Sequence, residues 1–153
     1  MKKYAVLLLA LVPHIAMADF DDTESNNWLA EGLSHYIRSK EDSNFVAQLV
    51  SIGRNSSIVA FYDVKRTCFG DGGDRKKVKI FYQWVNYTKI CRGGTGYWIP
   101  SSQRGIDFVS QKFTSNSDVK VLFGGNNYSF STKNFPSVRQ HWESTLRTSG
   151  DAL

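Results

Sequence analysis

The feature that most constrains the fold is a succession of short segments rich in aromatic and β-branched residues, separated by clusters of glycine, serine and asparagine. Such regular alternation is typical of an antiparallel β-sandwich or barrel. Residues 77–85 give the clearest example, because hydrophobic and basic residues alternate there with the period of two that a strand requires. Further strands are expected at residues 45–52, 58–69, 87–91, 97–99, 106–113, 119–123 and 128–131.

Two segments at the ends of this region have helical spacing instead. Near the C-terminus, Ser137 and Gln140 form a capping box, and apolar residues spaced around Trp142 predict an amphipathic helix. Residues 28–40 also carry apolar side chains at helical spacing and predict a short N-terminal helix. The expected fold is therefore mainly β (α+β), with one antiparallel β-sandwich or barrel-like sheet, a C-terminal amphipathic helix and a short N-terminal helix.

The N-terminus has the pattern of a secretory signal peptide. Two lysines precede the apolar run of residues 5–12, which is too short to span a bilayer, and an A-x-A motif ends at Ala18. We therefore expect residues 1–18 to be a cleaved signal, residues 19–27 an acidic flexible leader, and residues 28–153 a single globular domain. The double-lysine start favours a bacterial protein, so the expected location is the periplasm or the medium, with no span of the membrane.

Cys68 and Cys91 are the two cysteines of the chain. An exported protein with two cysteines usually pairs them, because its surroundings are oxidising. Their spacing is not C-x-x-C, and no histidine flanks either one, so a redox or nucleophilic role is disfavoured. We expect a structural disulfide that staples the domain.

The charge of the chain excludes the strong basic excess of a nucleic-acid-binding protein. The net charge is +5, with 19 basic and 14 acidic residues; loss of Lys2 and Lys3 with the signal leaves 17 against 14, or +3. The basic residues gather in the middle of the chain and interleave with aromatic ones. Surfaces of this kind bind acidic protein partners, among other anions.

The sequence therefore favours a small exported binding protein without catalytic activity, such as an inhibitor, an immunity protein, or an accessory protein of secretion or pilus machinery. Its partner is expected to be an acidic protein of the cell envelope or the exterior. In residues 77–85, side-chain alternation predicts that Val78, Ile80, Tyr82 and Trp84 face the core. The candidate binding residues are Lys77, Lys79, Phe81, Arg92, Tyr97 and Trp98.

The alternative is a small secreted hydrolase, similar to a ribonuclease in its chemistry, that uses His35 and His141 as acid and base. Both histidines are expected on solvated helices, and the distance between their imidazoles would discriminate the two functions. The chain has too few histidines and cysteines for an ordinary zinc site, so no metal and no cofactor are expected. The oligomeric state is left open by the sequence.

Overall fold

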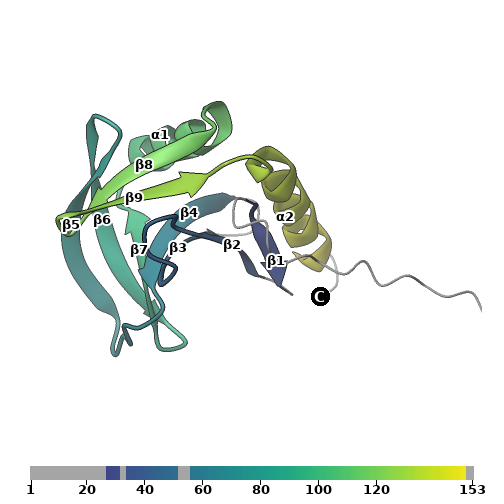
Figure 1. Cartoon of the computed structure of the whole chain (residues 1–153). Helices are drawn as coiled ribbons and strands as arrows, with labels where there is room; N and C mark the ends of the chain where they lie inside the picture. Colours follow the sequence, from purple (N-terminus) through teal and green to yellow (C-terminus); the bar gives the residue numbers. More distant parts are fainter. Residues whose placement is uncertain (1–26, 32–33, 52–55, 151–153) are drawn as a thin grey trace, which may run out of the picture.

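The computed structural model describes residues 27–31, 34–51 and 56–150 (Figure 1). In this part of the chain nine strands and two helices are present. The strands are β1 (Leu29–Glu31), β2 (Ser34–Arg38), β3 (Phe45–Ser51), β4 (Ser57–Asp63), β5 (Gly72–Ile80), β6 (Gln83–Arg92), β7 (Thr95–Pro100), β8 (Asp118–Phe123) and β9 (Asn126–Ser131). The helices are α1 (Gln103–Ser115), between β7 and β8, and α2 (Phe135–Gly150), after β9.

All nine strands belong to one antiparallel sheet in the order β1-β2-β3-β4-β7-β6-β5-β8-β9. Strands β5, β6 and β7 fold back on one another, so that β7 returns to pair with β4. The sheet curls into a half-barrel with the two helices against it (Figure 1). The prediction of a mainly β, antiparallel fold with a C-terminal helix is confirmed, in its barrel-like form.

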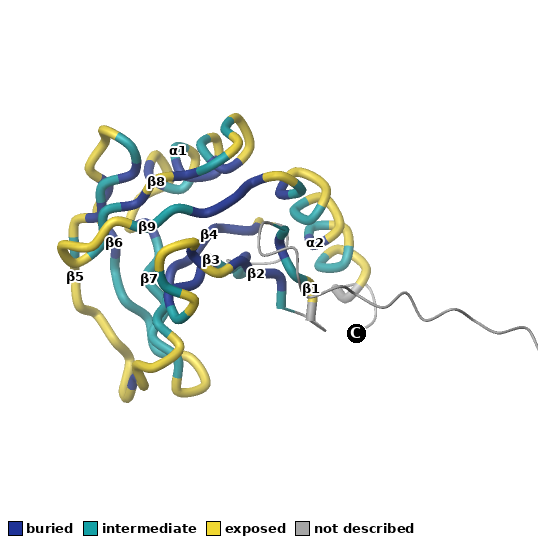
Figure 2. Tube along the Cα trace, viewed as in Figure 1, coloured by how far each residue is buried: buried dark blue, intermediate teal, exposed yellow. Residues whose placement is uncertain are grey.

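The core lies on the concave face of the curled sheet (Figure 2). Phe61 of β4 is at its centre, fully buried, with its ring centroid 5.5 Å from that of Phe130 and 5.7 Å from that of Tyr87. Helix α1 contributes Val109 and Phe113 to the same cluster. Burying such large side chains stabilises the fold by roughly 1.5–3 kcal/mol each.

Trp28, just before β1, joins the first strand of the sheet to the end of the last. Its indole nitrogen donates a hydrogen bond to the carbonyl of Ser131 (3.1 Å), and its backbone N–H donates one to the side chain of Asn134 (2.8 Å). The indole also packs edge-on against Phe113, at a centroid distance of 5.8 Å, and against Phe135 at 4.9 Å. Trp28 therefore holds β1, α1 and the start of α2 together.

A second contact joins the turn after β2 to β9. The backbone N–H of Lys40 donates to the carbonyl of Ser129 (3.0 Å), and the Glu41 carboxylate accepts hydrogen bonds from the Ser129 N–H (2.5 Å) and hydroxyl (2.6 Å). Lys40 also pairs with Asp118 of β8 at 2.7 Å. These contacts hold the sheet in its curl although β2 and β9 do not form a ladder.

The predicted N-terminal helix over residues 28–40 is wrong, because this segment forms β1 and β2. Strand β2 pairs with β3, with His35 opposite Leu49 and Ile37 opposite Ala47. The ladder with β3 satisfies the backbone hydrogen bonds of β2, and this tertiary pairing overrides a weak helical pattern.

The predicted strand over residues 106–113 is also wrong, because these residues lie in α1. The helix begins after Ser102, whose side-chain oxygen accepts a hydrogen bond from the Gly105 N–H at 3.2 Å. Val109 and Phe113 are four residues apart and face the core. Serine is a favourable N-cap residue, so Ser102 is the feature of the sequence that could have predicted this helix.

The predicted strand over residues 77–85 is two strands joined by a tight turn at Phe81 and Tyr82. Phe81 has a φ of 51°, and its N–H donates to the Lys120 carbonyl at 2.9 Å. The chain reverses there without the glycine or asparagine that such turns favour. Val78 and Ile80 are buried as predicted, whereas Tyr82 is 93 % exposed and Trp84 is 51 % exposed, so their placement in the core is wrong.

Other element boundaries shift by a few residues. The strand predicted over residues 58–69 ends at Asp63, where the chain enters the loop that carries Cys68. The C-terminal helix begins at Phe135, two residues before the expected capping box. None of the helices in the described part of the chain is long and apolar enough to cross a membrane.

We expect Trp28→Ala to lower the free energy of unfolding by about 3–5 kcal/mol, because the substitution leaves a cavity beside Phe113 and Phe135 and removes the bond to Ser131. Urea unfolding followed by circular dichroism measures the change. Trp84→Ala is the matched control, since that indole is half exposed. A loss for Trp28→Ala no larger than for Trp84→Ala would contradict the role assigned to Trp28.

Candidate binding site at the mouth of the half-barrel

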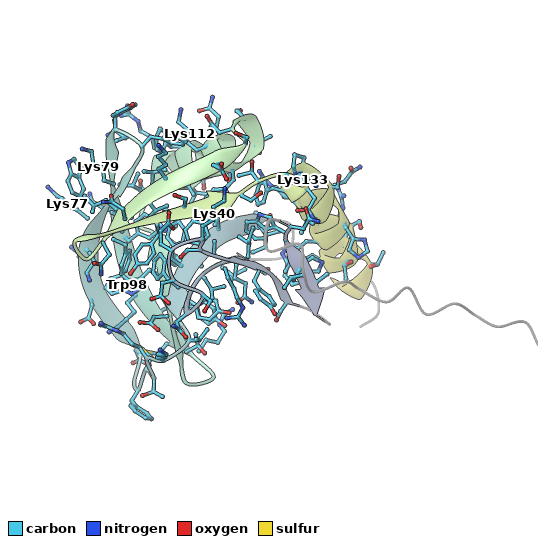
Figure 3. All side chains as sticks on the ribbon, viewed as in Figure 1. Lys40, Lys77, Lys79, Trp98, Lys112 and Lys133 are labelled. Carbon is cyan, nitrogen blue, oxygen red and sulfur yellow. A yellow bond between two sulfur atoms is a disulfide. The ribbon has the colours of Figure 1, made fainter. Side chains whose placement is uncertain are left out.

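The predicted binding residues do not form one surface, because the sheet separates them. Lys77 and Lys79 lie on the convex face, alternating with the buried Val78 and Ile80, and they project outward in Figure 3. Trp98 lies on the concave face, as shown by its register position opposite Phe61.

The other predicted residues occupy two further environments, because Tyr97 and Arg92 line one shallow pocket and Phe81 lies elsewhere. Phe81 is half-buried at the β5–β6 turn, with the Lys112 ammonium 5.9 Å from its ring centroid. Tyr97 packs against Tyr62 with a centroid distance of 5.2 Å, on the side of the sheet opposite Trp98. Arg92 is exposed at the end of β6. Of the six predicted residues, only Trp98 lies in the pocket described next.

The concave face continues beyond the core into an open pocket of about 740 Å³ at one end of the half-barrel, which we call the mouth. Strand alternation explains its lining, since side chains two residues apart face the same way. Lys76 precedes the buried Val78 by two residues, and Lys89 follows the buried Tyr87 by two. The same offset from core residues places these side chains in the mouth: Asp63, Lys76, Lys89, Phe123 and Tyr128.

In the mouth, the ammonium groups of Lys76 and Lys89 both lie near the indole ring of Trp98. The Lys76 Nζ lies 5.1 Å from the ring centroid of Trp98 and 4.7 Å from that of Phe123, and the Lys89 Nζ lies 5.6 Å from the Trp98 centroid. Trp98 and Phe123 meet edge to face at 5.6 Å. The rings attract both cations through cation–π interactions.

The mouth carries an excess of positive charge. Lys89 is paired with Asp74 and Arg66 with Asp63, but in the described part of the chain no carboxylate lies within ion-pair distance of Lys76. A cation held in a concave site without a counter-ion favours an anionic ligand. The lining holds four cationic side chains and one carboxylate: Lys65, Arg66, Lys76, Lys89 and Asp63.

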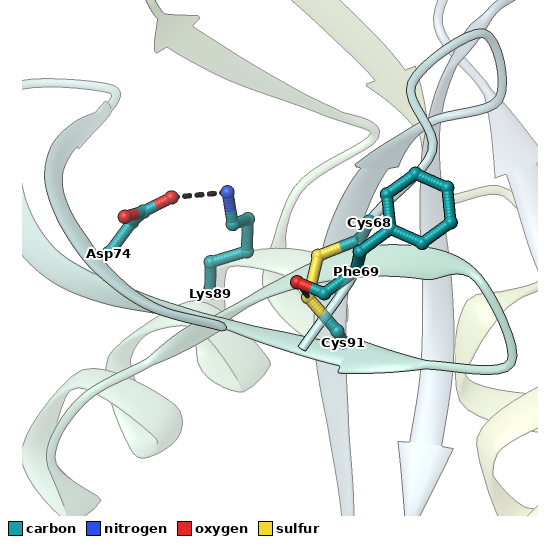
Figure 4. The surroundings of a disulfide bond; sticks show 5 residues. All are labelled: Cys68, Phe69, Asp74, Lys89 and Cys91. Atoms are coloured by element: carbon teal, nitrogen blue, oxygen red, sulfur yellow. Dashed lines mark hydrogen bonds and ion pairs between the residues drawn. A yellow bond between two sulfur atoms is a disulfide. The ribbon is translucent and has the colours of Figure 1, made fainter. Parts of the chain in front are cut away.

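The disulfide between Cys68 and Cys91 fixes one wall of the mouth (Figure 4). It closes a loop of 23 residues, and the N–H of Cys68 also donates to the carbonyl of Gly94 at 2.8 Å. Gly96 allows this close approach, because a Cβ there would lie 3.2 Å from the Cys68 side chain. The adjacent Phe69 is 87 % exposed but does not line the mouth, and its ring lies on the other side of the disulfide from Lys89 (Figure 4).

Sequence reasoning missed Lys76, Lys89 and Phe123 as site residues. The alternation in residues 77–85 contained part of the signal, because it placed Val78 on the core face and therefore Lys76 on the same side. Lys89 lies on β6 and Phe123 on β8. These strands come near Trp98 only because of the order of strands in the sheet, in which β7 lies between β4 and β6. That order is a tertiary property and is not visible in local patterns.

The two histidines lie together at a different place. His35 of β2 and His141 of α2 have ring centroids 5.8 Å apart, and His35 lies 5.1 Å from Trp142. The expectation of two solvated helix histidines is therefore wrong for His35, which is on a strand and 4 % exposed. A general base has to reach the proton that it takes. The distance of 5.8 Å does not exclude shared acid–base chemistry, and the burial of His35 is the observation that weighs against the hydrolase alternative.

Comparison with known proteins adds no family: no family model, no curated protein and no solved structure matches the chain. The function is therefore argued from the geometry of the mouth.

We expect the Cys68→Ser, Cys91→Ser double variant to lose about 3 kcal/mol of unfolding free energy, because the loop that the disulfide closes regains its freedom in the unfolded chain. Urea unfolding of the variant and of the oxidised wild type measures this difference. A loss below about 1 kcal/mol would show that the wall of the mouth is held by its hydrogen bonds to the β6–β7 turn instead.

We expect the protein to lose stability as the pH falls below about 6.5. Burial, and after it the charge of His141, lower the pKa of His35 from its ordinary value of 6.5. As the pH falls, the imidazole of His35 is therefore protonated in the unfolded chain before it is protonated in the folded one. The stability that the neutral His35 contributes is complete above pH 6.5 and is lost as the pH falls from there to the lowered pKa. Urea unfolding at pH 7.5 and pH 5.5 in metal-free buffer tests the sign.

The control for this pH dependence is His141→Gln. This variant removes the smaller of the two causes that lower the pKa of His35, so the difference in unfolding free energy between pH 7.5 and pH 5.5 should be smaller. Glu143 does not interfere in this window. Burial alone would raise its pKa, but hydrogen bonds from Arg139 and Ser57 lower it overall, so its effect begins below about pH 4.5. Equal or greater stability of the wild type at pH 5.5 would contradict the burial of a neutral His35.

Proposed function

We propose that this chain is an exported binding protein without catalytic activity, and that its mouth holds an acidic segment of a protein partner. The observation that carries the proposal is the position of Lys76, a cation fixed between Trp98 and Phe123 with no counter-ion among the described residues. A carboxylate from a partner would complete this arrangement with a charge-assisted hydrogen bond.

The dimensions and lining of the mouth support a side chain or short segment as the ligand. Its volume of about 740 Å³ lies within the range of about 300–1,000 Å³ that is usual for ligand pockets. Its walls combine charged side chains with aromatic ones, among them Tyr128, which stacks on Phe45 at a centroid distance of 4.0 Å. A segment that carries both an acidic and an apolar group would contact both kinds of surface.

An exposed aromatic side chain on the loop of Cys68 supports a protein partner over a small free anion. Phe69 is almost fully exposed on a loop that the disulfide already holds, so little conformational freedom is lost when it binds. Rigid, exposed aromatic side chains are frequent anchors in protein interfaces. Inhibitors, immunity proteins and accessory proteins of secretion or pilus assembly are the classes that this arrangement suits.

Export is part of the proposal. It rests on the signal-like pattern of residues 1–18, which lie outside the described residues, together with the disulfide. Disulfides form and persist mainly in oxidising compartments such as the periplasm and the exterior.

The experiment compares charge reversal at two adjacent residues on opposite faces of β5. Tagged wild-type protein is used to recover its partner from an envelope extract of the source cells, and affinities for the purified partner are then measured by calorimetry. Lys76→Glu should weaken binding by at least about tenfold, because it places a carboxylate against the partner's acidic group. Lys77→Glu is the matched control, since Lys77 lies on the convex face, and it should change the affinity by less than about threefold.

Circular dichroism and thermal melting confirm that both variants fold. Loss of affinity in Lys77→Glu alone would move the site to the convex face, and equal affinities of both variants would exclude both surfaces. Failure of the wild type to recover any stoichiometric partner would contradict the binding function itself.

A further inference from the structure

His35 is a buried polar group without a partner among the described residues. Neither of its ring nitrogens has a hydrogen-bond partner there, and the nearby indole nitrogen of Trp142 also lacks one. Buried polar groups are almost always satisfied by protein, water or an ion, so each exception calls for an explanation. His35 is also held firmly, on a strand in the middle of a three-stranded ladder with β1 and β3.

The side chain that faces His35 is itself a strong ligand. His141 comes from α2, its ring centroid lies 5.8 Å from that of His35, and its own side chain is exposed. Imidazole is the commonest metal ligand in proteins. The pair therefore offers two nitrogen ligands, a buried one from β2 and an accessible one from α2.

The spacing of the rings fits one shared metal ion. Since a Zn–N bond is about 2.0–2.1 Å long and a ring nitrogen lies about 1.1 Å from its centroid, two imidazoles on one ion have centroids roughly 5–6.5 Å apart. The observed 5.8 Å falls within this interval. The planes of the two rings are inclined at 46°, so they are not stacked face to face.

We propose that His35 and His141 bind a divalent transition-metal ion, such as Zn²⁺, that links α2 to β2. Imidazole pairs suit zinc, copper and nickel, whereas Mg²⁺ and Ca²⁺ prefer oxygen ligands. No group of three or more histidine, cysteine, aspartate and glutamate side chains in the described part of the chain could hold a metal. The ion therefore keeps water or an outside ligand at its remaining positions, on the accessible side next to His141.

Such an ion would fasten the C-terminal helix. Helix α2 reaches the sheet through a small set of contacts, among them Trp142 in the core and the hydrogen bond from Ser57 to Glu143 at 2.9 Å. A metal that binds only when His35 and His141 face each other adds its binding free energy to the folded state.

The test measures thermal unfolding of the wild type with the metal as the only added ligand. Zn²⁺ at 0.5 mM and pH 7.5 should raise Tm by about 5 °C or more, because the ion binds the folded state in preference to the unfolded one. The same concentration of Mg²⁺ should leave Tm unchanged. Calorimetry should give one Zn²⁺ per chain, and NMR should show the imidazole signals of both histidines shifting together.

His141→Asn is the decisive variant, because the His141 side chain is exposed; circular dichroism without added metal checks that the variant folds. It should lose the Zn²⁺-induced rise in Tm, whereas Gln140→Asn, one residue away on the exposed side of α2, should keep it. His14 is present in all variants, so any contribution from it cancels. An equal rise in His141→Asn would show that zinc binds elsewhere, and no rise in the wild type would show that the pair holds no metal; either result overturns the proposal.

Discussion

The contacts that hold the two ends of the sheet together are the constraint on which the rest of the molecule depends. Trp28 bonds to Ser131 at one point, and the Glu41 carboxylate receives two hydrogen bonds from Ser129 at another. A sheet of nine strands left open would present both faces to solvent or to other chains. Because the curl is held, one face becomes a concave core filled by α1, and the same face continues outward as the mouth.

Local alternation was enough to predict part of this arrangement. It placed Val78 and Ile80 in the core and Lys77 and Lys79 outside, and the cysteines were correctly paired from the expected compartment. It failed at Phe81, where a turn forms without a turn residue, and within α1, whose hydrophobic residues fit either period. At Phe81 a contact distant in sequence, the bond to Lys120, holds the turn, whereas the start of α1 is held by the local cap at Ser102.

The candidate sites were less predictable than the fold for a related reason. The mouth collects side chains from strands that are neighbours only in the final sheet order, so Lys76 and Lys89 gave no joint signal in the sequence. The histidine pair likewise joins residues 35 and 141 through the packing of a helix on a strand. The sheet divides the expected lysines and aromatic residues between two faces, with Lys77 and Lys79 on one and Trp98 on the other. The concave face carries the mouth, with a volume of about 740 Å³.

The wall that carries Cys68 has a consequence for how this protein can diverge. The segment between β4 and β5 is anchored by a covalent bond, by one isolated bridge from Thr67 to Thr95 and by the bond of Cys68 to Gly94, and not by a continuous strand ladder. Insertions, deletions and substitutions between its anchors would therefore leave the register of every strand unchanged. Changes in the loop around Phe69 would alter the exposed surface beside the disulfide, while the half-barrel and the lysines on its inner face would stay in place.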